Sequence, residues 1–379
     1  MSGAAPFTRR RTSSIKAAES GGTAATSVRR CSIGEKRASG AEGGQDISPA
    51  RAGAAPALIV FGPTASGKSA LAVALAQRLG GTVVNADSMQ VYRELRVLTA
   101  RPSPAEEAAA PHRLYGVRPA AEPASAAWWR GAALAAMEEA RAEGRLPILC
   151  GGTGFYINAL THGLAAIPEP APAARAEARA LLDSLGSARL HARLAEADPA
   201  TAARLRPTDG QRVARAWEVW RDTGRGLAAW QGAGAAPAPG WRFGAVVLDP
   251  PRAALRAAIA ARFARMLAEG AAEEVRALLA LGLDPSLPAM RAHGVREIAA
   301  ALRGTISLEE AERRTVLATG QYAKRQATWL RHHLIAEGQE GSHIIANKRA
   351  DEQFSESILP KIRGFICSAV DAAQHDVYQ

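Results

Sequence analysis

The stretch that decides the fold is a phosphate-binding signature, Gly62-Pro63-Thr64-Ala65-Ser66-Gly67-Lys68-Ser69. It fits the pattern Gly-x-x-x-x-Gly-Lys-[Ser/Thr], known as the P-loop. Glycines let successive backbone N–H groups curl around a phosphate, and the helix that follows points its positive end at the same anion. Lys68 adds a point charge, and the Ser69 hydroxyl can hold Mg²⁺. The alternative, an ordinary glycine-rich loop, requires the flanking pattern to be a coincidence.

The residues on either side of this loop predict the context that a P-loop needs. The apolar run 57–61 predicts a buried strand before it, and residues 69–79 predict a helix after it. Further strands are expected at 82–86, 146–150 and 245–249, with a helix at 126–143. Alternating strands and helices predict an α/β fold, a P-loop NTPase-like parallel sheet with flanking helices and an inserted helical unit.

Composition divides the rest of the chain into segments. Several helical stretches follow the proline-rich residues 168–172 and predict the insertion, at 173–185, 187–196, 199–205 and 209–223. Long amphipathic helices are predicted at 252–281, 294–303 and 307–333, and a short element near 351–372. The predicted organisation is a disordered basic extension at 1–55, the first part of the core at 56–160, the helical insertion at 161–235, the completion of the core at 241–334 and a variable tail at 335–379.

The chain is basic, which favours a polyanionic partner. Its 379 residues carry a formal net charge of +11. About half of this charge lies in residues 1–55, so the remainder is itself basic, and nucleic acid is the first candidate partner. A basic proteome with solvated arginines is the alternative. The three cysteines lie far apart without ligand spacing, which predicts neither a zinc site nor a disulfide framework. No apolar run approaches the roughly 18 residues of a membrane span, so we expect no membrane partner.

Four features outside the loop could carry chemistry. Asp87 follows the second predicted strand and could bind Mg²⁺ or act as a general base, the alternative being a helix cap. Gly151-Gly152-Thr153-Gly154 ends another strand and could present N–H groups or the Thr153 hydroxyl to a ligand, unless its glycines only form a tight turn. Asp249 ends an apolar strand, as the Mg²⁺-binding acid of a P-loop ATPase does, but it precedes two prolines and is interpreted as a turn acid. Arg262 falls inside an apolar helical stripe and needs an anion, which a bound phosphate or a buried carboxylate would supply.

Basic residues beside aromatics occur in three clusters. They are found at 211–215, at 290–297 and at 322–333. Arginine and lysine next to aromatic side chains suit a phosphate backbone and unstacked bases, although each cluster alone is typical of a solvated helix face.

These stretches together resemble the tRNA dimethylallyltransferase family, also called tRNA isopentenyltransferases. The matching segments run in family order across about 56–333. They are GPTASGKSALA (62–72), NADSMQVYR (85–93), APHRLYG (110–116), LCGGTGFYINAL (149–160), DPATAARLRPTDGQRVARAWEV (198–219), LD-x-x-R (248–252), RFARMLAEGAAEEVRAL (262–278), MRAHGVREI (290–298) and QYAKRQATWLR (321–331).

The resemblance implies a reaction and its partners. The P-loop would hold the diphosphate of dimethylallyl diphosphate, and the allyl group would pass to N6 of a flipped adenine, adenosine 37 next to the anticodon. Asp87 would be the general base, with Thr153 close to the acceptor. Lys68, Ser69 with Mg²⁺, and Arg262 would stabilise the departing diphosphate. The residues implied in tRNA contact are Asp87, Ser88, Met89, Gln90, Gln211, Arg212, Arg215, Arg291, Arg296, Lys324, Arg325, Gln326 and Arg331.

The resemblance also sets expectations about partners and location. The helical insertion, about 160–205, would grip the anticodon stem, and we expect a monomer. The family's Gly-Thr-Ala-Lys-Pro reads Leu98-Thr99-Ala100-Arg101-Pro102 here, and its Gly-Tyr-Arg reads Gly294-Val295-Arg296. The C-terminal zinc finger common in eukaryotic relatives has no counterpart, which favours the bacterial type and a cytoplasmic location. Residues 1–55 would instead indicate a mitochondrion if they act as a transit peptide.

Two other functions fit the same loop. One is a small-molecule or nucleoside kinase that uses ATP. The other is a nucleic-acid-binding ATPase. The kinase lacks a convincing second acid for Mg²⁺ and leaves the basic C-terminal helices unexplained.

Overall fold

A parallel sheet positions the phosphate-binding loop. The structure, a computed structural model, describes residues 54–232, 237–333, 343–346 and 352–375. Within these ranges six strands pair in parallel in the order β3-β2-β4-β1-β5-β6. The strands are β1 (Ala55–Phe61), β2 (Gly81–Asn85), β3 (His112–Arg113), β4 (Leu146–Gly151), β5 (Trp241–Leu248) and β6 (His343–Ala346). The predicted parallel α/β sheet is therefore confirmed, and β1 lies between β4 and β5.

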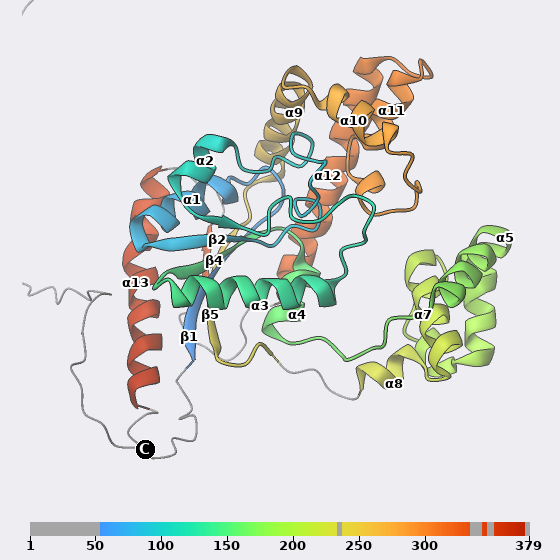
Figure 1. Ribbon diagram of the computed structural model, residues 1–379, viewed down its shortest axis with the longest axis horizontal. Helices are drawn as coiled ribbons and strands as arrows, with labels where there is room; N and C mark the ends of the chain where they lie inside the picture. The colour runs from blue at the N-terminus through green and yellow to red at the C-terminus, as the bar shows by residue number, and fades with distance from the viewer. Residues whose placement is uncertain (1–53, 233–236, 334–342, 347–351, 376–379) are drawn as a thin grey trace, which may run out of the picture. The chain divides into compact units, whose positions relative to one another are not determined.

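Helices cover both faces of this sheet (Figure 1). Those of the sheet region before the insertion are α1 (Lys68–Leu79), α2 (Pro104–Ala109), α3 (Ala126–Ala142) and α4 (Gly154–Thr161). After β5 come α9 (Arg252–Ala268), α10 (Ala271–Ala280), a 3-10 turn (Ala289–Arg291), α11 (Val295–Leu302), α12 (Leu308–His332) and α13 (Glu352–His375).

The alternation of side chains along β1 assigns the helices to the two faces. Leu58 and Val60 pack in one buried cluster with residues of α1 and α13. Ile59 and Phe61 point the other way, into a cluster with α3, α4 and α9 to α11. Burying each of these side chains stabilises the fold by about 1.5–3 kcal/mol. The loop after Phe61 is thereby held at the carboxyl edge of a strand buried on both faces.

The predicted insertion forms a helical unit with its own core. It contains α5 (Pro172–Ala197), α6 (Pro199–Ala202), α7 (Gly210–Thr223) and α8 (Leu227–Gln231). Leu190, Leu194, Val213 and Trp217 are buried in its apolar cluster. Gly186 has φ 75° and ψ 166°, so the helical path breaks inside α5, between the two helices that the sequence predicts there.

Three features after residue 240 differ from the prediction or extend it. The helical stretch predicted at 252–281 consists of two helices, because Gly270 adopts φ 99° and separates α9 from α10. Strand β6 was not predicted, and α13 extends the short element expected near 351–372. The expected extension at 1–55 lies, apart from its last two residues, outside the described residues. Within the described ranges no helix is both long and apolar enough to span a bilayer.

Candidate functional site

The phosphate-binding loop joins β1 to α1 and has the conformation that its glycines permit. Gly67 lies in the left-handed region with φ 91° and directly precedes the first residue of α1. Ser66 donates its N–H to the Pro63 carbonyl at 3.2 Å, which closes the turn. Its side chain is fully buried, and the hydroxyl makes no hydrogen bond with the described residues. The backbone N–H groups that open α1 thus face the loop, as anion binding requires.

Lys68 is a buried cation in this loop. Burial lowers the pKa of its ammonium group, and the negative charge of Asp87 opposes that shift. The thiol of Cys150 lies close by at the end of β4, where burial raises its pKa to about 11. A buried ammonium is stable only beside compensating charge, so the site favours an anion.

A pocket of about 550 Å³ opens beside the loop, and we call it the loop pocket. Ala65, Gly67 and Ser69 contribute to its wall. Its cationic lining residues are Lys68, Arg96, Arg101, Arg262 and Arg265, against the acids Glu106 and Glu269. This excess of positive charge around exposed loop amides suits a diphosphate or another compact polyanion.

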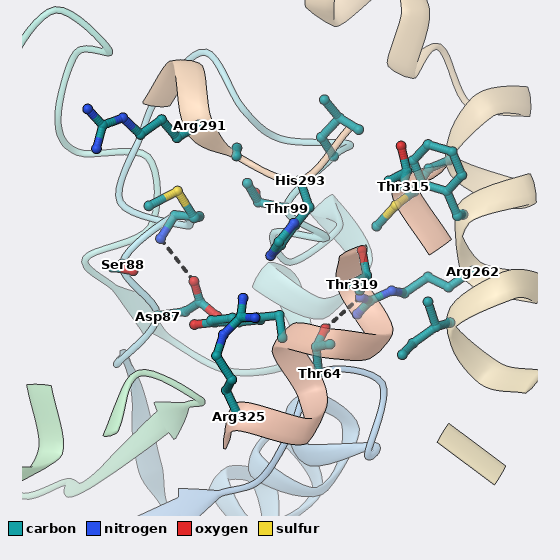
Figure 2. Close-up of a pocket in the computed structure, with 17 residues that line it drawn as sticks. Thr64, Asp87, Ser88, Thr99, Arg262, Arg291, His293, Thr315, Thr319 and Arg325 are labelled. Carbon is teal, nitrogen blue, oxygen red and sulfur yellow. Dashed lines mark hydrogen bonds between the residues drawn. The ribbon is translucent and has the colours of Figure 1, made fainter. Parts of the chain in front are cut away.

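A second cavity of about 330 Å³ contains Asp87, and we call it the Asp87 cavity. Asp87 follows β2, where the Asn85 side chain accepts its N–H at 2.8 Å and donates to its carbonyl oxygen at 3.0 Å. One carboxylate oxygen accepts the Met89 N–H at 2.9 Å. Figure 2 shows Asp87, His293 and Arg325 directed toward the same space. The strand end therefore presents a carboxylate to the cavity, as the sequence predicts for a residue at this edge.

Arg262 connects the two pockets, because its side chain lines both. Its guanidinium donates to the Thr64 hydroxyl at 2.6 Å (Figure 2). Leu255, Ile259, Phe263 and Met266 of α9 are buried, so Arg262 faces inward with this stripe. The inward direction predicted for Arg262 is confirmed, and the side chain reaches the phosphate-binding loop.

Gln326 of α12 ties the loop to the end of β4. Its amide oxygen accepts the Thr64 N–H at 2.9 Å, and its amide nitrogen donates to the Gly152 carbonyl at 2.7 Å. The side chain is only 5% exposed. The sequence suggested that Gln326 contacts RNA, whereas the structure commits both ends of its amide to the protein interior.

The glycines of the predicted Gly-Gly-Thr-Gly turn serve close packing. An added Cβ would lie 2.1 Å from the Ala86 backbone at Gly151, 2.2 Å from the Gln326 amide at Gly152 and 2.3 Å from the Trp329 ring at Gly154. None of the three has a positive φ. A missing side chain, rather than an unusual backbone angle, explains these glycines. The Thr153 hydroxyl between them accepts the Ser88 N–H at 3.0 Å, so it braces the segment after Asp87.

Two aromatic side chains complete the Asp87 cavity. The rings of His293 and Tyr322 have centroids 5.1 Å apart, and Arg325 lies over Tyr322 at 5.5 Å. Burial raises the pKa of Tyr322 to about 12, and the Asp87 charge adds to this shift. Burial lowers the pKa of His293, as does the positive charge of Arg325. These side chains offer flat, uncharged surfaces on which a heterocyclic base could stack.

The structure brings some predicted RNA-binding residues together and separates others. Ser88, Met89, Arg291 and Arg325 line the Asp87 cavity. Arg296 and Lys324 are exposed and line neither pocket. Three lie on α7 in the helical unit, namely Gln211, Arg212 and Arg215. The two arginines among them form ion pairs there, Arg212 with Asp209 and Arg215 with Glu218.

The remaining predicted residues have internal partners. Gln90 donates from its amide nitrogen to the carbonyls of Thr99 and Ala100, both at 2.8 Å. Arg331 forms an ion pair with Asp249 at 3.6 Å, which agrees with the interpretation of Asp249 as a structural acid.

Sequence reasoning missed the wall that both pockets share. Residues 96–101 contribute to each pocket, and Glu274 of α10 contacts their backbone. No local pattern indicates this contact, because Glu274 lies 176 residues or more from its partners.

Comparisons with known proteins agree with this geometry. The IPP transferase family model matches residues 90–333, and an isopentenyl transferase model matches residues 56–119. The tRNA dimethylallyltransferase of Granulibacter bethesdensis is 61% identical over 310 residues, which cover 82% of this chain and 97% of that protein. The tRNA dimethylallyltransferase of Gluconobacter oxydans is 58% identical over 317 residues, covering 84% and 96%.

Solved structures add a likeness of fold. The tRNA isopentenylpyrophosphate transferase of Bacillus halodurans is 30% identical with a TM-score of 0.59, covering 86% of this chain and 99% of that one. A eukaryotic dimethylallyltransferase acting on tRNA is 23% identical with a TM-score of 0.69, covering 83% of this chain and 80% of that one. At this identity the match supports the fold alone. With one family model spanning most of the chain and curated relatives this similar, the chain belongs to the IPP transferase family, that of the tRNA dimethylallyltransferases.

Proposed function

We propose that this chain transfers the dimethylallyl group of dimethylallyl diphosphate to N6 of adenosine 37, next to the anticodon of tRNA. The observation that carries this proposal is the position of Arg262, which lines a cation-rich pocket and a carboxylate-bearing cavity at once. A leaving diphosphate and an attacking base can therefore meet at one arginine. Membership of the family supports the same reaction.

The loop pocket suits the leaving group. Breaking an allylic carbon–oxygen bond sends the electron pair to the diphosphate, so the added negative charge must be neutralised in place. Lys68 is buried beside the loop amides, and Arg262 is already aligned by its bond to Thr64. Fixed donors of this kind stabilise the departing anion without having to reorganise.

The Asp87 cavity suits the acceptor. As the carbon–nitrogen bond forms, N6 must lose a proton, and the Asp87 carboxylate can receive it. Its second oxygen is left for this task, since one already accepts the Met89 N–H. The adenine must leave its stack to enter, at a low cost in an unpaired loop, and the rings of His293 and Tyr322 offer it a surface.

The residues present fit Mg²⁺ only together with a bound diphosphate. Among the described residues no cluster of three or more Cys, His, Asp or Glu side chains could hold a metal alone. Ser69 lines the loop pocket next to Lys68. Its hydroxyl would hold Mg²⁺ with phosphate oxygens as the other ligands, and the metal would add charge neutralisation on the diphosphate.

Basic surfaces outside the pockets suit the rest of the tRNA. Arg291 and Arg325 line the Asp87 cavity, while Arg296 and Lys324 are exposed on α11 and α12. We expect these groups and the arginines of α7 to bind backbone phosphates, and the helical unit to contact the anticodon stem. We expect a monomer to be active.

The decisive experiment measures whether the label of radioactive dimethylallyl diphosphate is transferred to RNA. The protein is incubated with it and an unmodified anticodon stem-loop that carries adenosine at position 37, with a guanosine 37 stem-loop as control. We expect label in the first RNA and none in the second. Steady ATP hydrolysis or phosphoryl transfer without labelled RNA would instead establish the kinase or ATPase alternative.

Replacing Asp87 by Asn tests the base directly. An asparagine oxygen can still accept the Met89 N–H, so the local turn should persist. We expect kcat to fall by about 10²–10⁴-fold while the Kd for the stem-loop changes less than about twofold. Asp249→Asn, which alters an acid at another strand end, should leave turnover within about threefold. An equal loss of binding and turnover in the Asp87 variant would mean that Asp87 is a structural cap.

A further inference from the structure

Residues 96–101 form a wall common to both pockets, and we call this segment the shared loop. Leu98 and Thr99 line the Asp87 cavity, whereas Arg96, Val97, Ala100 and Arg101 line the loop pocket. The segment belongs to no helix or strand. Ala100 adopts φ 51°, a left-handed conformation that residues other than glycine rarely take without external support. The position of this loop therefore affects both substrates, and contacts from elsewhere must hold it.

Glu274 provides a contact of this kind from a distant part of the chain. One carboxylate oxygen accepts the N–H groups of Arg96 and Val97, both at 2.7 Å, and the other accepts that of Leu98 at 2.9 Å. Three consecutive amides thus converge on one carboxylate, in the manner of a backbone nest around an anion. Hydrogen bonds to a charged acceptor are stronger than neutral ones.

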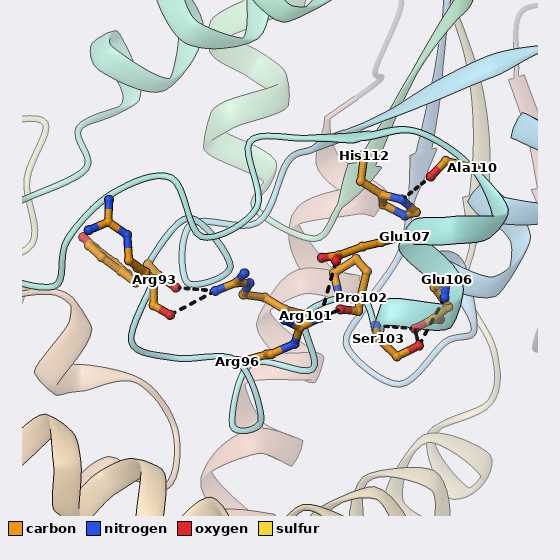
Figure 3. Close-up of polar contacts among 10 residues, drawn as sticks. Arg93, Arg96, Arg101, Pro102, Ser103, Glu106, Glu107, Ala110 and His112 are labelled. Carbon is orange, nitrogen blue, oxygen red and sulfur yellow. Dashed lines mark hydrogen bonds and ion pairs between the residues drawn. The ribbon is translucent and has the colours of Figure 1, made fainter.

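Other contacts that hold the shared loop come from residues close to it in the sequence. Gln90 donates to the carbonyls of Thr99 and Ala100. The Arg101 guanidinium donates to the carbonyl of Arg93 at 3.0 Å, and that of Arg96 donates to Pro102 at 2.8 Å (Figure 3). These partners lie within about a dozen residues of the loop itself. Glu274 differs because it belongs to α10, which follows the Arg262 helix after Gly270.

We propose that Glu274 is a positioning residue for prenyl transfer, which holds the shared loop in the conformation that shapes both pockets. Its carboxylate joins the loop to the α9–α10 segment that carries Arg262. The cations of the shared loop, Arg96 and Arg101, and the α9 cations Arg262 and Arg265 then keep a constant spacing around the diphosphate. The expected effects on kinetics rest on the proposed function. The hydrogen bonds by which Glu274 holds the shared loop in place do not depend on that function.

The neighbouring Glu273 provides a matched control. It lies on the same helix, is 67% exposed and pairs with Arg276 at 3.7 Å. Glu273→Gln removes the same charge from the same element without touching the shared loop. Glu274→Gln keeps the size of the side chain, but only one of its two terminal atoms can still accept a hydrogen bond. Glu274→Asp keeps the charge but shortens the side chain by one methylene group, so it tests whether the carboxylate must reach the amides of the shared loop.

The experiment measures amide hydrogen exchange in peptides that span 94–101, together with kcat and KM for dimethylallyl diphosphate and the anticodon stem-loop. We expect Glu274→Gln to speed exchange in these peptides at least tenfold and to lower kcat/KM for both substrates about tenfold or more. Glu274→Asp should recover part of both effects, and Glu273→Gln should stay within twofold of wild type.

Two results would overturn the proposal. One is wild-type exchange at 94–101 together with wild-type kinetics in Glu274→Gln. The other is faster exchange throughout the sheet with a matching loss of melting temperature, which would make Glu274 a residue of general stability. If the wild-type protein labels no RNA, the proposed function fails, while the exchange comparison still decides whether Glu274 holds the loop.

Discussion

The loop pocket and the Asp87 cavity lie on either side of one arginine and yet differ in their lining. The loop pocket is lined by residues of the phosphate-binding loop and by cations, with Glu106 and Glu269 as its acids. The Asp87 cavity also has arginines in its wall, but it adds a carboxylate, the rings of a histidine and a tyrosine, several threonines and apolar side chains. The difference indicates that each pocket receives one reactant, an anion in the first and a heterocyclic base in the second. A substitution in one pocket should therefore change the constants for one reactant and leave those for the other reactant nearly unchanged.

The largest expected effect comes from the loop pocket. Lys68→Ala removes the buried cation of the phosphate-binding loop. We expect kcat/KM for dimethylallyl diphosphate to fall about 10²–10³-fold, because an aligned donor to the leaving group is lost. The Kd for the stem-loop should change less than about twofold if the pockets are separate. Arg78→Ala, at the exposed end of the same helix, is the control. Equal loss of RNA binding in the Lys68 variant would remove the distinction between the pockets.

Arg325→Ala is the corresponding test of the Asp87 cavity, with RNA binding as the constant that should change. Arg325 is exposed and lies over the Tyr322 ring at the cavity wall. We expect its loss to weaken stem-loop binding about 5- to 150-fold, as for a lost contact of about 1–3 kcal/mol. The slope of log K against log salt should shrink by about one if the contact is to a phosphate. The KM for dimethylallyl diphosphate should be unaffected, and a parallel rise in both constants would contradict the assignment.

Gln326 fixes the backbone of the phosphate-binding loop from within the protein interior, so its replacement should destabilise the fold around that loop. Gln326→Leu leaves the Thr64 N–H and the Gly152 carbonyl without their partner. Each unsatisfied buried group costs about 1–3 kcal/mol, so chemical denaturation should show a lower free energy of unfolding. Gln321→Leu, exposed on the same helix, is the matched control. Unchanged stability would mean that the buried amide contributes little to holding the phosphate-binding loop.

The smallest expected effect is a pH dependence confined to the Asp87 cavity. Burial and the nearby Arg325 lower the pKa of His293, while Glu297 and Asp87 oppose the shift. Between the lowered value and about 6.5 the unfolded chain binds more protons than the folded one, so the free energy of unfolding falls as pH drops through this window. His293→Phe should flatten that fall in urea titrations from pH 8 to pH 5. The Lys68→Ala variant should keep the wild-type slope, and a flattened slope there would link the pockets electrostatically.

The parts of the fold that depend on local pattern could be predicted from the sequence. An apolar run, a glycine-rich turn and a helical period were enough to place β1, the loop and α1. The inward direction of Arg262 also follows from helical spacing alone, since it lies seven residues after Leu255 in the buried stripe of α9. The left-handed conformation of Gly270 marks the break between α9 and α10, which composition alone does not require because an isolated glycine is tolerated in many helices.

Contacts between distant segments could not be predicted in this way. Gln326 reaches Thr64 across 262 residues, and Glu274 reaches the shared loop across 176 or more. Nothing in the neighbourhood of either residue distinguishes it from an exposed helical Gln or Glu. Strand β6 is four residues long and its pairing with β5 depends on the sheet edge already being present. Tertiary packing decides each of these features.

The bond between the Thr64 N–H and Gln326 has a consequence for synthesis of the protein. Ribosomes add about 5–20 residues per second, so the 262 residues that separate these partners correspond to roughly 13–52 s. Throughout that interval a nascent chain carries the phosphate-binding loop without the amide that fixes it. A half-made chain should therefore bind diphosphate poorly until α12 has been synthesised and Gln326 has reached the loop.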